Sequence, residues 1–481
     1  MVRTGHMRRY RMKKTLRKGT AILTVFVLAA SLAACGGKKE AEEPETTAQE
    51  QKETTAAAET TAAETEKAVE TFTDKGTDSH ALTLKDGDSY KGIKVEKTGD
   101  SNKNDEADFT GTNAAVYAGD GVTAEIEDAE ISASGKHANA VFAYGDGAYI
   151  TLTGSEITTD SDFSGGIMVA GGGQIDAHGL KVKTSGDSSA PVRSDRGGGS
   201  ISIDGGSFES GGKGSPAIYS TADIEAEGAS FKANASQAVV IEGKNSVTLV
   251  DSSLTSAHTK LNGDQTDRKQ AVMIYQSMSG DAEEGESYFT MDGGSITSTE
   301  GGMFFVTNTV TTISLGSVEM KYADDDLLTV AAAGWGDEGI NGGQVSMYND
   351  NQKLEGKITV DEISNLNLVL DNESEFSGSI NGGGEVDVEV VGDSKWILTE
   401  DSQIASLTCD EESIDLNGHT LMVGSKKYAE GTVVEGEWID TKIYEKGDKA
   451  EKYKPAPDDG KPLGEKPDMK PIGDGPDKQP R

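Results

Sequence analysis

Three consecutive stretches of 26 residues decide the fold: GDGVTAEIEDAEISASGKHANAVFAY (119–144), GDGAYITLTGSEITTDSDFSGGIMVA (145–170) and GGGQIDAHGLKVKTSGDSSAPVRSDR (171–196). Each stretch begins with a glycine-rich turn, and the turn Gly197-Gly198-Gly199 follows at the same spacing. Between turns lie three short segments in which apolar and polar residues alternate, as in β-strands. Three short strands in each repeat predict a parallel β-helix, because a coil buries its inner face only when another stacks upon it.

The apolar positions recur in three sets, one for each strand of the repeat. Their members are Val122/Ala124/Ile126, Ile150/Leu152, Ile175/Ala177 and Ile201/Ile203; Ile131, Ile157, Val182 and Phe208; and Val116, Val141, Ile167 and Val192. We therefore expect an all-β, single-stranded, right-handed parallel β-helix over residues 78–425. About twelve coils at 4.8 Å per strand would measure roughly 55–60 Å. A β-propeller or β-sandwich is the alternative, but 26 residues are too few for a four-stranded blade and the spacing is too regular for a sandwich.

Extra residues interrupt the repeat farther along the chain, at about 256–269 and 278–287, and we expect them to project as loops. The open ends of a β-helix need covering, because unpaired strand edges promote aggregation. Leu82–Lys97 and Tyr428–Tyr444 are the expected caps, the second within a C-terminal cap over 426–447.

The first 34 residues have the pattern of an export signal. Eight Lys and Arg and no acidic residue precede the apolar run Ala21–Ala30, which is too short for a membrane-spanning helix of ~20 residues. Leu32-Ala33-Ala34-Cys35 then resembles the bacterial lipobox, in which the cysteine receives the lipid. We expect lipidation of Cys35, with two or three acyl chains giving stable membrane attachment where one would be marginal. Cys409 then has no cysteine left to pair with and is expected to be a small buried residue.

Two segments have compositions that do not support a core. Residues 35–77, after the lipidated cysteine, are mainly Glu, Thr, Ala and Gln, and predict a disordered tether. Residues 448–481 contain seven of the ten prolines and predict a disordered, extended tail. The tether would hold the β-helix away from the membrane, on the extracellular face of the cell and within or beyond the wall.

The exported chain is strongly acidic. Without the eight cations of the leader, 37 Lys and Arg oppose 82 Asp and Glu, a net charge near −45. Such a field repels nucleic acid, anionic lipid and anionic glycans unless a cation such as Ca²⁺ bridges them. Nucleic acid is therefore excluded as a partner, and the membrane contact is expected through the lipid alone.

From about Asn113 to Leu421 the sequence resembles β-helical surface lipoproteins of Gram-positive bacteria that are described as pectate-lyase-like or autotransporter-like. The segments that carry the resemblance include Asn139–Ala143, Asp195–Gly199, Ser215–Ser220, Val240–Asn245, Phe305–Thr309, Asn341–Gly343 and Ser394–Thr399. The resemblance implies an adhesin-like role at the cell surface. It supplies no catalytic residues, because these segments specify turns and coils.

Some β-helices are enzymes, and a few residues of this sequence resemble catalytic sets. Arg193, Asp195 and Arg196, with Glu242 and Lys244 one to two coils on, imitate the base and carboxylates of a Ca²⁺-dependent pectate lyase. The alternative interpretation, which we favour, is a solvated ion network across a turn. The acidic run 324–326 lacks the accompanying motifs of galacturonan hydrolases, whose paired carboxylates act at ~6.5–9.5 Å.

Two further patterns suggest ligand sites. Asp120 and Asp146 occupy one position of stacked turns, where carboxylates ~5 Å apart would repel without a bridging Ca²⁺; solvated turn acids are the alternative. Trp335 lies in a Gly-rich loop near Asp337 and Asn341, where an exposed indole could stack on a sugar, or else fold back onto a coil. We expect a non-catalytic, adhesin-like surface protein that binds a protein or glycan. The alternative is a Ca²⁺-dependent polysaccharide-binding protein, lyase or hydrolase.

Overall fold

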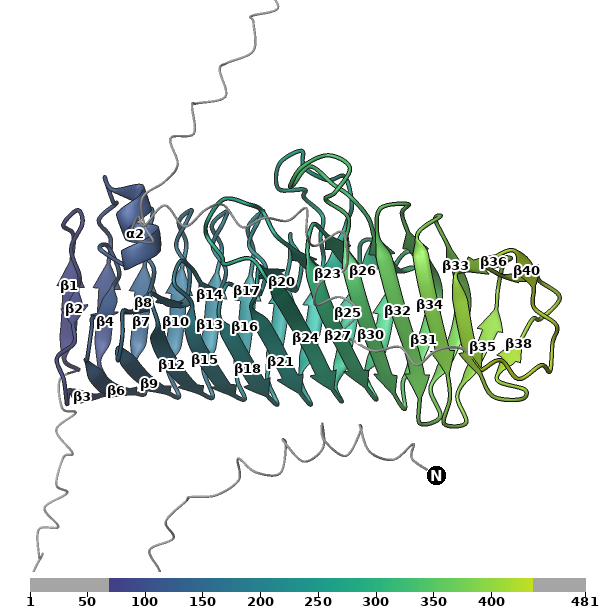
Figure 1. Ribbon diagram of the computed structural model, residues 1–481. Helices are drawn as coiled ribbons and strands as arrows, with labels where there is room; N and C mark the ends of the chain where they lie inside the picture. The colour runs from purple at the N-terminus through teal and green to yellow at the C-terminus, as the bar shows by residue number, and fades with distance from the viewer. Residues whose placement is uncertain (1–68, 436–481) are drawn as a thin grey trace, which may run out of the picture. The chain divides into compact units, whose positions relative to one another are not determined.

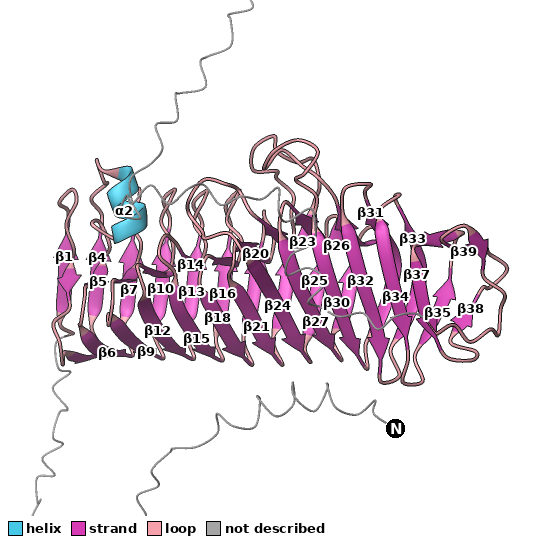
Figure 2. Ribbon diagram, in the orientation of Figure 1, coloured by secondary structure: helices cyan, strands magenta, loops and turns pink. Residues whose placement is uncertain are grey.

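The computed structural model describes residues 69–435; the leader, most of the predicted tether and the proline-rich tail lie outside this range. The described chain forms a parallel β-helix whose coils stack one upon the next (Figure 1). Most coils pass in turn through three sheets, which we call A, B and C, whereas the last coils have no strand in sheet A; equivalent strands pair in parallel. Figure 2 shows the short helix α2 (Asn104–Thr110) on the outside of these sheets.

Sheet A contains ten strands: β1 (Thr71–Asp74), β4 (Lys94–Lys97), β7 (Glu130–Ala133), β10 (Glu156–Thr159), β13 (Lys181–Thr184), β16 (Ser207–Ser210), β19 (Ser230–Ala233), β22 (Ser253–Ser256), β25 (Ser295–Ser298) and β28 (Glu319–Tyr322). Sheet B contains fourteen: β2 (Leu82–Thr83), β5 (Val116–Ala118), β8 (Val141–Tyr144), β11 (Ile167–Ala170), β14 (Val192–Ser194), β17 (Ile218–Ser220), β20 (Val239–Glu242), β23 (Gln270–Tyr275), β26 (Gly302–Thr307), β29 (Asp326–Val330), β31 (Lys353–Val360), β33 (Glu375–Asn381), β35 (Lys395–Leu398) and β38 (Ile414–Asp415).

Sheet C contains thirteen strands: β3 (Ser89–Lys91), β6 (Thr123–Glu127), β9 (Tyr149–Thr153), β12 (Gly173–His178), β15 (Gly199–Asp204), β18 (Asp223–Glu227), β21 (Ser246–Val250), β24 (Glu286–Asp292), β27 (Val310–Gly316), β30 (Gln344–Asp350), β32 (Asn365–Asp371), β34 (Glu385–Val390) and β37 (Ser406–Cys409). A small fourth sheet lies at the C-terminal end: β36 (Ser402–Ile404), β39 (Leu421–Val423) and β40 (Lys426–Lys427).

The three predicted sets of apolar positions are confirmed, one in each sheet. In sheet A the pairing runs from Ile131 through Ile157 and Val182 to Phe208, and the other two sets form equivalent columns in sheets B and C. These side chains point inward and form one continuous core along the coils. The column in sheet A continues into Phe231, whose ring stacks on Phe208 at 5.1 Å. The hydrophobic period of the sequence is therefore the period of the core.

Serine side chains link successive coils at the corner between sheets A and B. The backbone amides of Ala138, Ser164 and Ser189 each donate a hydrogen bond to a serine hydroxyl in the next coil, Ser164, Ser189 and Ser215 in turn, at 2.8–3.1 Å. All three serines are fully buried. Because buried amides need partners, these hydroxyls compensate for backbone bonds that the corner leaves unmade.

The coils become shorter toward the C-terminal end. β31 and β33 are long strands of sheet B, and sheet A ends at β28. The paired residues Leu354, Phe376, Trp396 and Ile414 are separated by 22, 20 and 18 residues. The loss of one strand from each coil accounts for these shorter spacings.

The β-helix begins earlier than predicted. β1 starts at Thr71, inside the segment 35–77 that we expected to be a disordered tether. Leu82–Lys97, expected as a cap, instead forms β2, β3 and β4 of the first coils. Sheet B accordingly has fourteen strands, against about twelve predicted coils. Strands of two residues, such as β2 and β38, are too short to show alternation in the sequence.

The two ends are closed differently. At the N-terminal end the fully buried Lys97 contacts the carboxylate of Asp74 at 2.8 Å and also donates to the carbonyl of Gly76. At the other end β39 and β40 pair antiparallel, and Val434 pairs antiparallel with Cys409. Antiparallel segments cover a parallel edge and hinder the addition of another strand. Cys409 is a buried free thiol, as predicted; the part of the expected cap beyond residue 435 lies outside the described residues.

Candidate functional site

Four insertions interrupt the coils, and each enters or leaves a strand of sheet B. They are residues 98–115 with α2, residues 257–269 before β23, residues 276–285 after β23, and residues 331–343 after β29. The second and third confirm the loops predicted at about 256–269 and 278–287. Figure 1 shows α2 and the longest loops on the same side of the stacked coils. We call the outer side of sheet B, with these insertions, the loop face.

The N-terminal part of the loop face is an apolar patch covered by the first insertion. Phe142 and Met168 point outward from paired positions, yet both are fully buried, in a cluster with Ala114. The segment after α2 approaches so closely that a Cβ at Gly111 would lie 2.7 Å from the Phe142 ring. Gly111 also has φ +75°, which favours glycine as the residue that ends the helix. Asp108 of α2 is held to His137 at 2.9 Å.

A second apolar patch lies farther along the same column. Val240, Met273 and Phe305 occupy paired outward positions and are buried. Trp335 packs on this patch, with its ring edge-to-face against Tyr275 at 5.0 Å. Of the two arrangements considered for Trp335, the structure has the indole folded back against the coils and half-buried. Part of the ring remains at the surface.

The other residues of the predicted Trp335 site are divided between structure and solvent. Asn341 is buried, and its side-chain amide donates to the carbonyls of Ala333 and Trp335, each at 2.8 Å. Asn341 therefore fixes the shape of the loop and does not offer its amide to a ligand. Asp337 is exposed at the tip of the loop.

Arg196 joins α2 to an insertion more than eighty residues away. Its guanidinium donates to Asp281 at 2.7 Å and lies over the ring of Phe109, 3.7 Å from the centroid. Phe109 belongs to α2 and Asp281 to the loop 276–285. Because only 17 % of the Arg196 side chain is exposed, this ion pair and cation–π contact are partly protected from water. Arg196 is thus a bridge within the loop face.

Arg193 and Asp195 form a buried pair, and the expectation of a solvated ion network is wrong for them. Their side chains lie 2.9 Å apart and are only 13 % and 4 % exposed. Burial raises the pKa of Asp195 to about 6, although Arg193 opposes the rise. Burial lowers the pKa of Arg193, but the nearby carboxylates outweigh it and leave a net increase. One guanidinium nitrogen of Arg193, Nη1, is buried without a hydrogen-bond partner.

Glu242 lies on the loop face at the end of β20, two residues after Val240 of the second apolar patch. It is 1 % exposed and accepts hydrogen bonds from the hydroxyls of Tyr219 at 2.5 Å, Tyr275 at 2.9 Å and Ser277. Burial, together with the charge of Glu242, raises the pKa of both tyrosines well above its usual value. Lys244, grouped with Glu242 in the sequence, instead forms an exposed pair with Glu283. The five residues that were compared with a pectate-lyase site therefore do not line one open groove.

The insertions 257–269 and 331–343 meet above sheet B. The amide of Gly334 donates to the carbonyl of Gln265 at 2.8 Å. Arg268 lies beneath, where it donates to Thr329 at 3.2 Å with its guanidinium 5.7 Å from the Phe305 centroid. The insertion before β23 and the insertion after β29 thus contact each other.

A recess of about 350 Å³ opens beside Arg268. Its lining includes Lys269, Gln270 and the carboxylates of Asp267, Asp324 and Asp326, so that the acidic run 324–326 contributes two of its three members. Both polar atoms of the Gln270 side chain are buried without a hydrogen-bond partner. An unsatisfied buried amide costs about 1–3 kcal/mol, which a ligand that bonded to it would recover.

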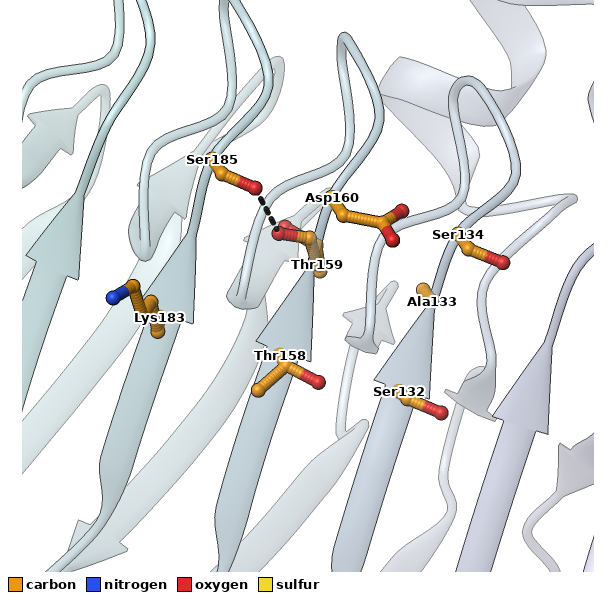
Figure 3. Close-up of a pocket in the computed structure, with 8 residues that line it drawn as sticks. All are labelled: Ser132, Ala133, Ser134, Thr158, Thr159, Asp160, Lys183 and Ser185. Atoms are coloured by element: carbon orange, nitrogen blue, oxygen red, sulfur yellow. Dashed lines mark hydrogen bonds between the residues drawn. The ribbon is translucent and has the colours of Figure 1, made fainter.

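A smaller recess of about 180 Å³ lies on the outer side of sheet A (Figure 3). It is lined by serine and threonine residues of β7, β10 and the following turns, with Asp160 and Lys183 at its edge. Ser185 donates a hydrogen bond to the Thr159 carbonyl of the neighbouring coil at 3.3 Å. These residues are spaced by the coil repeat itself, and no insertion encloses them.

Asp120 and Asp146 lie in successive turns, as predicted, and both are exposed. The Asp120 carboxylate lies against Gly145, where an added Cβ would come within 1.7 Å of the oxygen. Within residues 69–435 there is no group of three or more His, Cys, Asp or Glu placed to hold a metal ion. Ca²⁺ at these two turns stays a prediction that rests on the sequence.

Searches against protein-family models, curated proteins and solved structures found nothing that matches this chain. The resemblance to β-helical surface lipoproteins therefore stays a prediction. Among the described residues, no helix is long and apolar enough to cross a membrane. Sequence reasoning missed Tyr219, Tyr275, Ser277 and Asp281 as parts of the loop face, because their partners come from different coils. The 26-residue register could have placed Tyr219 beside Arg193, since the two are paired in sheet B.

Proposed function

We propose that this chain is a lipid-anchored protein of the extracellular face of the cell membrane, which binds another surface through its loop face and does not catalyse a reaction. The basic leader, the apolar run and the lipobox-like sequence before Cys35 support the anchor. The Glu/Thr/Ala-rich segment after it supports a spacer. The ligand would be a protein or glycan of a host, a neighbouring cell or a matrix.

The observation that carries this proposal is the convergence of all four insertions on one sheet. Insertions in repeat proteins commonly map to one face, which is often the binding face. Here the insertions also contact one another, through Gly334 and Gln265, and through Arg196 with Phe109 and Asp281. Loops held by a rigid scaffold are the usual carriers of binding residues. The outermost side chains, such as Met278 and Asp337, are exposed.

The state of the lyase-like residues supports binding over catalysis. A Ca²⁺-dependent lyase needs carboxylates and a basic side chain that reach substrate in a groove. In this chain Arg193 and Asp195 bind each other, and Glu242 is enclosed by two tyrosines and Ser277. Groups that are already paired and buried would have to separate before they could act.

A Ca²⁺-dependent polysaccharide-binding protein or lyase is the second candidate. The recess beside Arg268 favours a polysaccharide-binding protein over a lyase. The Arg268 guanidinium lines this recess and would pair with a sugar carboxylate. Three aspartates line the same space. The acidic chain would then take up anionic glycan either at this recess or through bridging Ca²⁺.

The test compares charge reversals on the two sides of the coils. The full-length chain and two double variants, Asp337→Lys/Glu338→Lys on the loop face and Asp204→Lys/Glu225→Lys on sheet C, are applied to a glycan array and to immobilised collagen and fibronectin. All four positions are exposed. We expect the loop-face variant to lose about tenfold or more in affinity, as at an interface hot spot, and the sheet C variant to bind as the wild type does. Equal binding by both variants, or no binding to any probe, would contradict the proposal.

The same array separates the second candidate. Binding that disappears with chelator, or with Arg268→Ala alone, would favour glycan recognition at the recess. Unsaturated uronate released in the presence of Ca²⁺ would overturn the non-catalytic proposal.

A further inference from the structure

A glycine opens the recess of about 350 Å³ that lies beside Arg268. Gln270 of β23 pairs with Gly302 of β26, and a Cβ added at Gly302 would lie 2.9 Å from the Cβ of Asp326 in β29. These three residues, on successive strands of sheet B, all line the recess. Because Gly302 has no side chain, a gap remains between Gln270 and Asp326. Its volume is at the lower end of the range for ligand pockets in proteins.

The recess holds charges of both signs that are separated from each other. The Arg268 guanidinium donates to Thr329 of β29 at 3.2 Å. Asp326 lies three residues earlier on the same strand, about 10 Å away along the backbone. Within residues 69–435, Arg268 forms no ion pair, whereas Arg193 and Arg196 each have a carboxylate partner. A ligand with an anionic and a cationic end would therefore be complementary to the two sides of the recess.

A buried amide without hydrogen bonds forms part of the same lining. Gln270 is 2 % exposed, and neither the nitrogen nor the oxygen of its side chain has a partner among the described residues. Burial of such a group is costly unless it is hydrogen-bonded. The last torsion of a glutamine side chain is broad, so that the amide can turn toward a ligand. A peptide-type amide, with one donor and one acceptor, would satisfy both atoms.

The acidic side of the recess suits an organic cation better than a metal ion. Asp267, Asp324 and Asp326 all line it. In the described part of the chain, however, no group of three or more His, Cys, Asp or Glu is placed to hold a metal ion. An ammonium group needs no such coordination shell. The net charge of −37 also attracts cationic partners over a longer range.

We propose that this recess binds the C-terminal lysine of a partner protein. Arg268 pairs with the terminal carboxylate, Gln270 with the last peptide bond, and Asp326 with the ε-ammonium. The flexible four-carbon stem of lysine carries its ammonium away from the carboxylate, which matches charges that lie apart along β29. The inference rests on the proposed binding role of the loop face, and names the group that one part of this face recognises.

Titration calorimetry of the full-length chain with small probes tests this inference. The main probe is Nα-acetyl-lysine, which carries the carboxylate, the ammonium and an amide. Nα-acetyl-lysinamide lacks the carboxylate, Nα,Nε-diacetyl-lysine lacks the ammonium, and lysine itself lacks the acyl amide. We expect each of these three to bind about tenfold or more weakly than Nα-acetyl-lysine, because one polar group of the recess would lose its partner.

Variants of the chain test the same assignment. Arg268→Gln and Asp326→Asn should each weaken the binding of Nα-acetyl-lysine about tenfold or more. Asp325→Asn is the matched control and should bind as the wild type does, since Asp325 pairs with Lys357 and is not part of the lining. Gln270→Met should weaken binding and also raise the urea midpoint of unfolding, because it removes a buried amide that has no partner.

Equal binding of Nα-acetyl-lysine and its amidated or diacetylated relatives would overturn the inference, as would equal binding by wild type and Arg268→Gln. Galacturonate that binds as tightly as Nα-acetyl-lysine would also overturn it, and would assign the recess to an acidic glycan. If Nα-acetyl-lysine does not bind while Asp337→Lys/Glu338→Lys still weakens binding to the surface probes, only this inference fails. If Nα-acetyl-lysine binds as expected while that double variant behaves as the wild type does, the recess stands and the wider role of the loop face fails.

Discussion

Buried ionic groups at two places show what single residues contribute to this β-helix. Arg193 and Asp195 pair beneath the loop face, and Lys97 and Asp74 pair at the N-terminal end. The sequence placed Arg193 near Asp195, since they lie two residues apart. It could not reveal their burial, because the residues around them include Asp281, which is remote in the sequence. The two pairs also respond to pH in opposite directions.

Ionisation of Asp195 should lower the free energy of unfolding as the pH rises from about 4 to 6. Burial raises its pKa in the folded chain to about 6, above ~3.9 for an unfolded aspartate, so the folded state binds the proton more tightly. Ionisation therefore costs the folded state stability in this window. We expect the unfolding free energy of the wild type, relative to Asp195→Asn, to decrease by about 1–3 kcal/mol between pH 4 and 7. Urea unfolding of both chains at a series of pH values measures this difference in unfolding free energy. A difference that stays constant from pH 4 to 7 would refute the prediction.

Substitution of Asp74 should destabilise the folded chain more than substitution of its partner Lys97. Asp74→Asn leaves a fully buried ammonium without its carboxylate, at a cost of about 3–5 kcal/mol. Lys97→Met leaves only Asp74, which is 23 % exposed and can be hydrated, so its cost should be smaller. The double variant should be more stable than Asp74→Asn alone. Urea unfolding at pH 7 compares the three, and equal destabilisation by both single variants would contradict this account.

Acid should weaken the same pair. Burial alone would raise the pKa of Asp74, but the hydrogen bonds from Lys97 and Ser79 lower it below its usual value. The stabilisation is therefore present at neutral pH, and is lost as the pH falls below about 4 and through the folded-state pKa. Asp74→Asn should show less acid destabilisation than the wild type in the same titration.

At the scale of elements, the sequence predicted the strands well. For the insertions it predicted only their positions along the chain. A strand column depends on residues that repeat at a fixed interval, such as Ile131, Ile157 and Val182, and this period is visible in a single sequence. The insertions at 257–269 and 276–285 were visible as interruptions. Their convergence on sheet B was not, because it depends on contacts such as that of Gly334 with Gln265, which no local pattern encodes. The helix α2, of seven residues, was missed for the same reason.

Arg196 should hold the loop 276–285 on the loop face. Arg196→Gln removes the ion pair with Asp281 and the stacking on Phe109. We expect amide hydrogen exchange to accelerate about tenfold in residues 276–285 and in α2, with sheets A and C unchanged. Lys244→Gln is the matched control, since its pair with Glu283 is exposed on both sides and surface ion pairs contribute little. Similar exchange in both variants would show that Arg196 does not fix the loop.

For the molecule as a whole, the sequence predicts an export leader over residues 1–34 and an acidic tether from Cys35, and the structure shows the β-helix that follows. The β-helix was predictable in fold class because its repeat is regular, whereas its start at Thr71 was not, because β1 and β2 are short strands at the end of the stack. The loop face runs along the side of the coils, which suits contact from the side. The proposed function therefore depends most on whether this β-helix is attached to the membrane through Cys35.

Metabolic labelling with an alkyne fatty acid tests that attachment most directly. Wild type and Cys35→Ala are expressed in a Gram-positive host, and the label is measured on the purified chain after membrane fractionation. We expect the wild type to carry label and to remain with the membrane, and Cys35→Ala to be unlabelled and released into the medium. Equal labelling and equal membrane retention of the two would contradict the lipid anchor, and with it the proposed display of the β-helix at the cell surface.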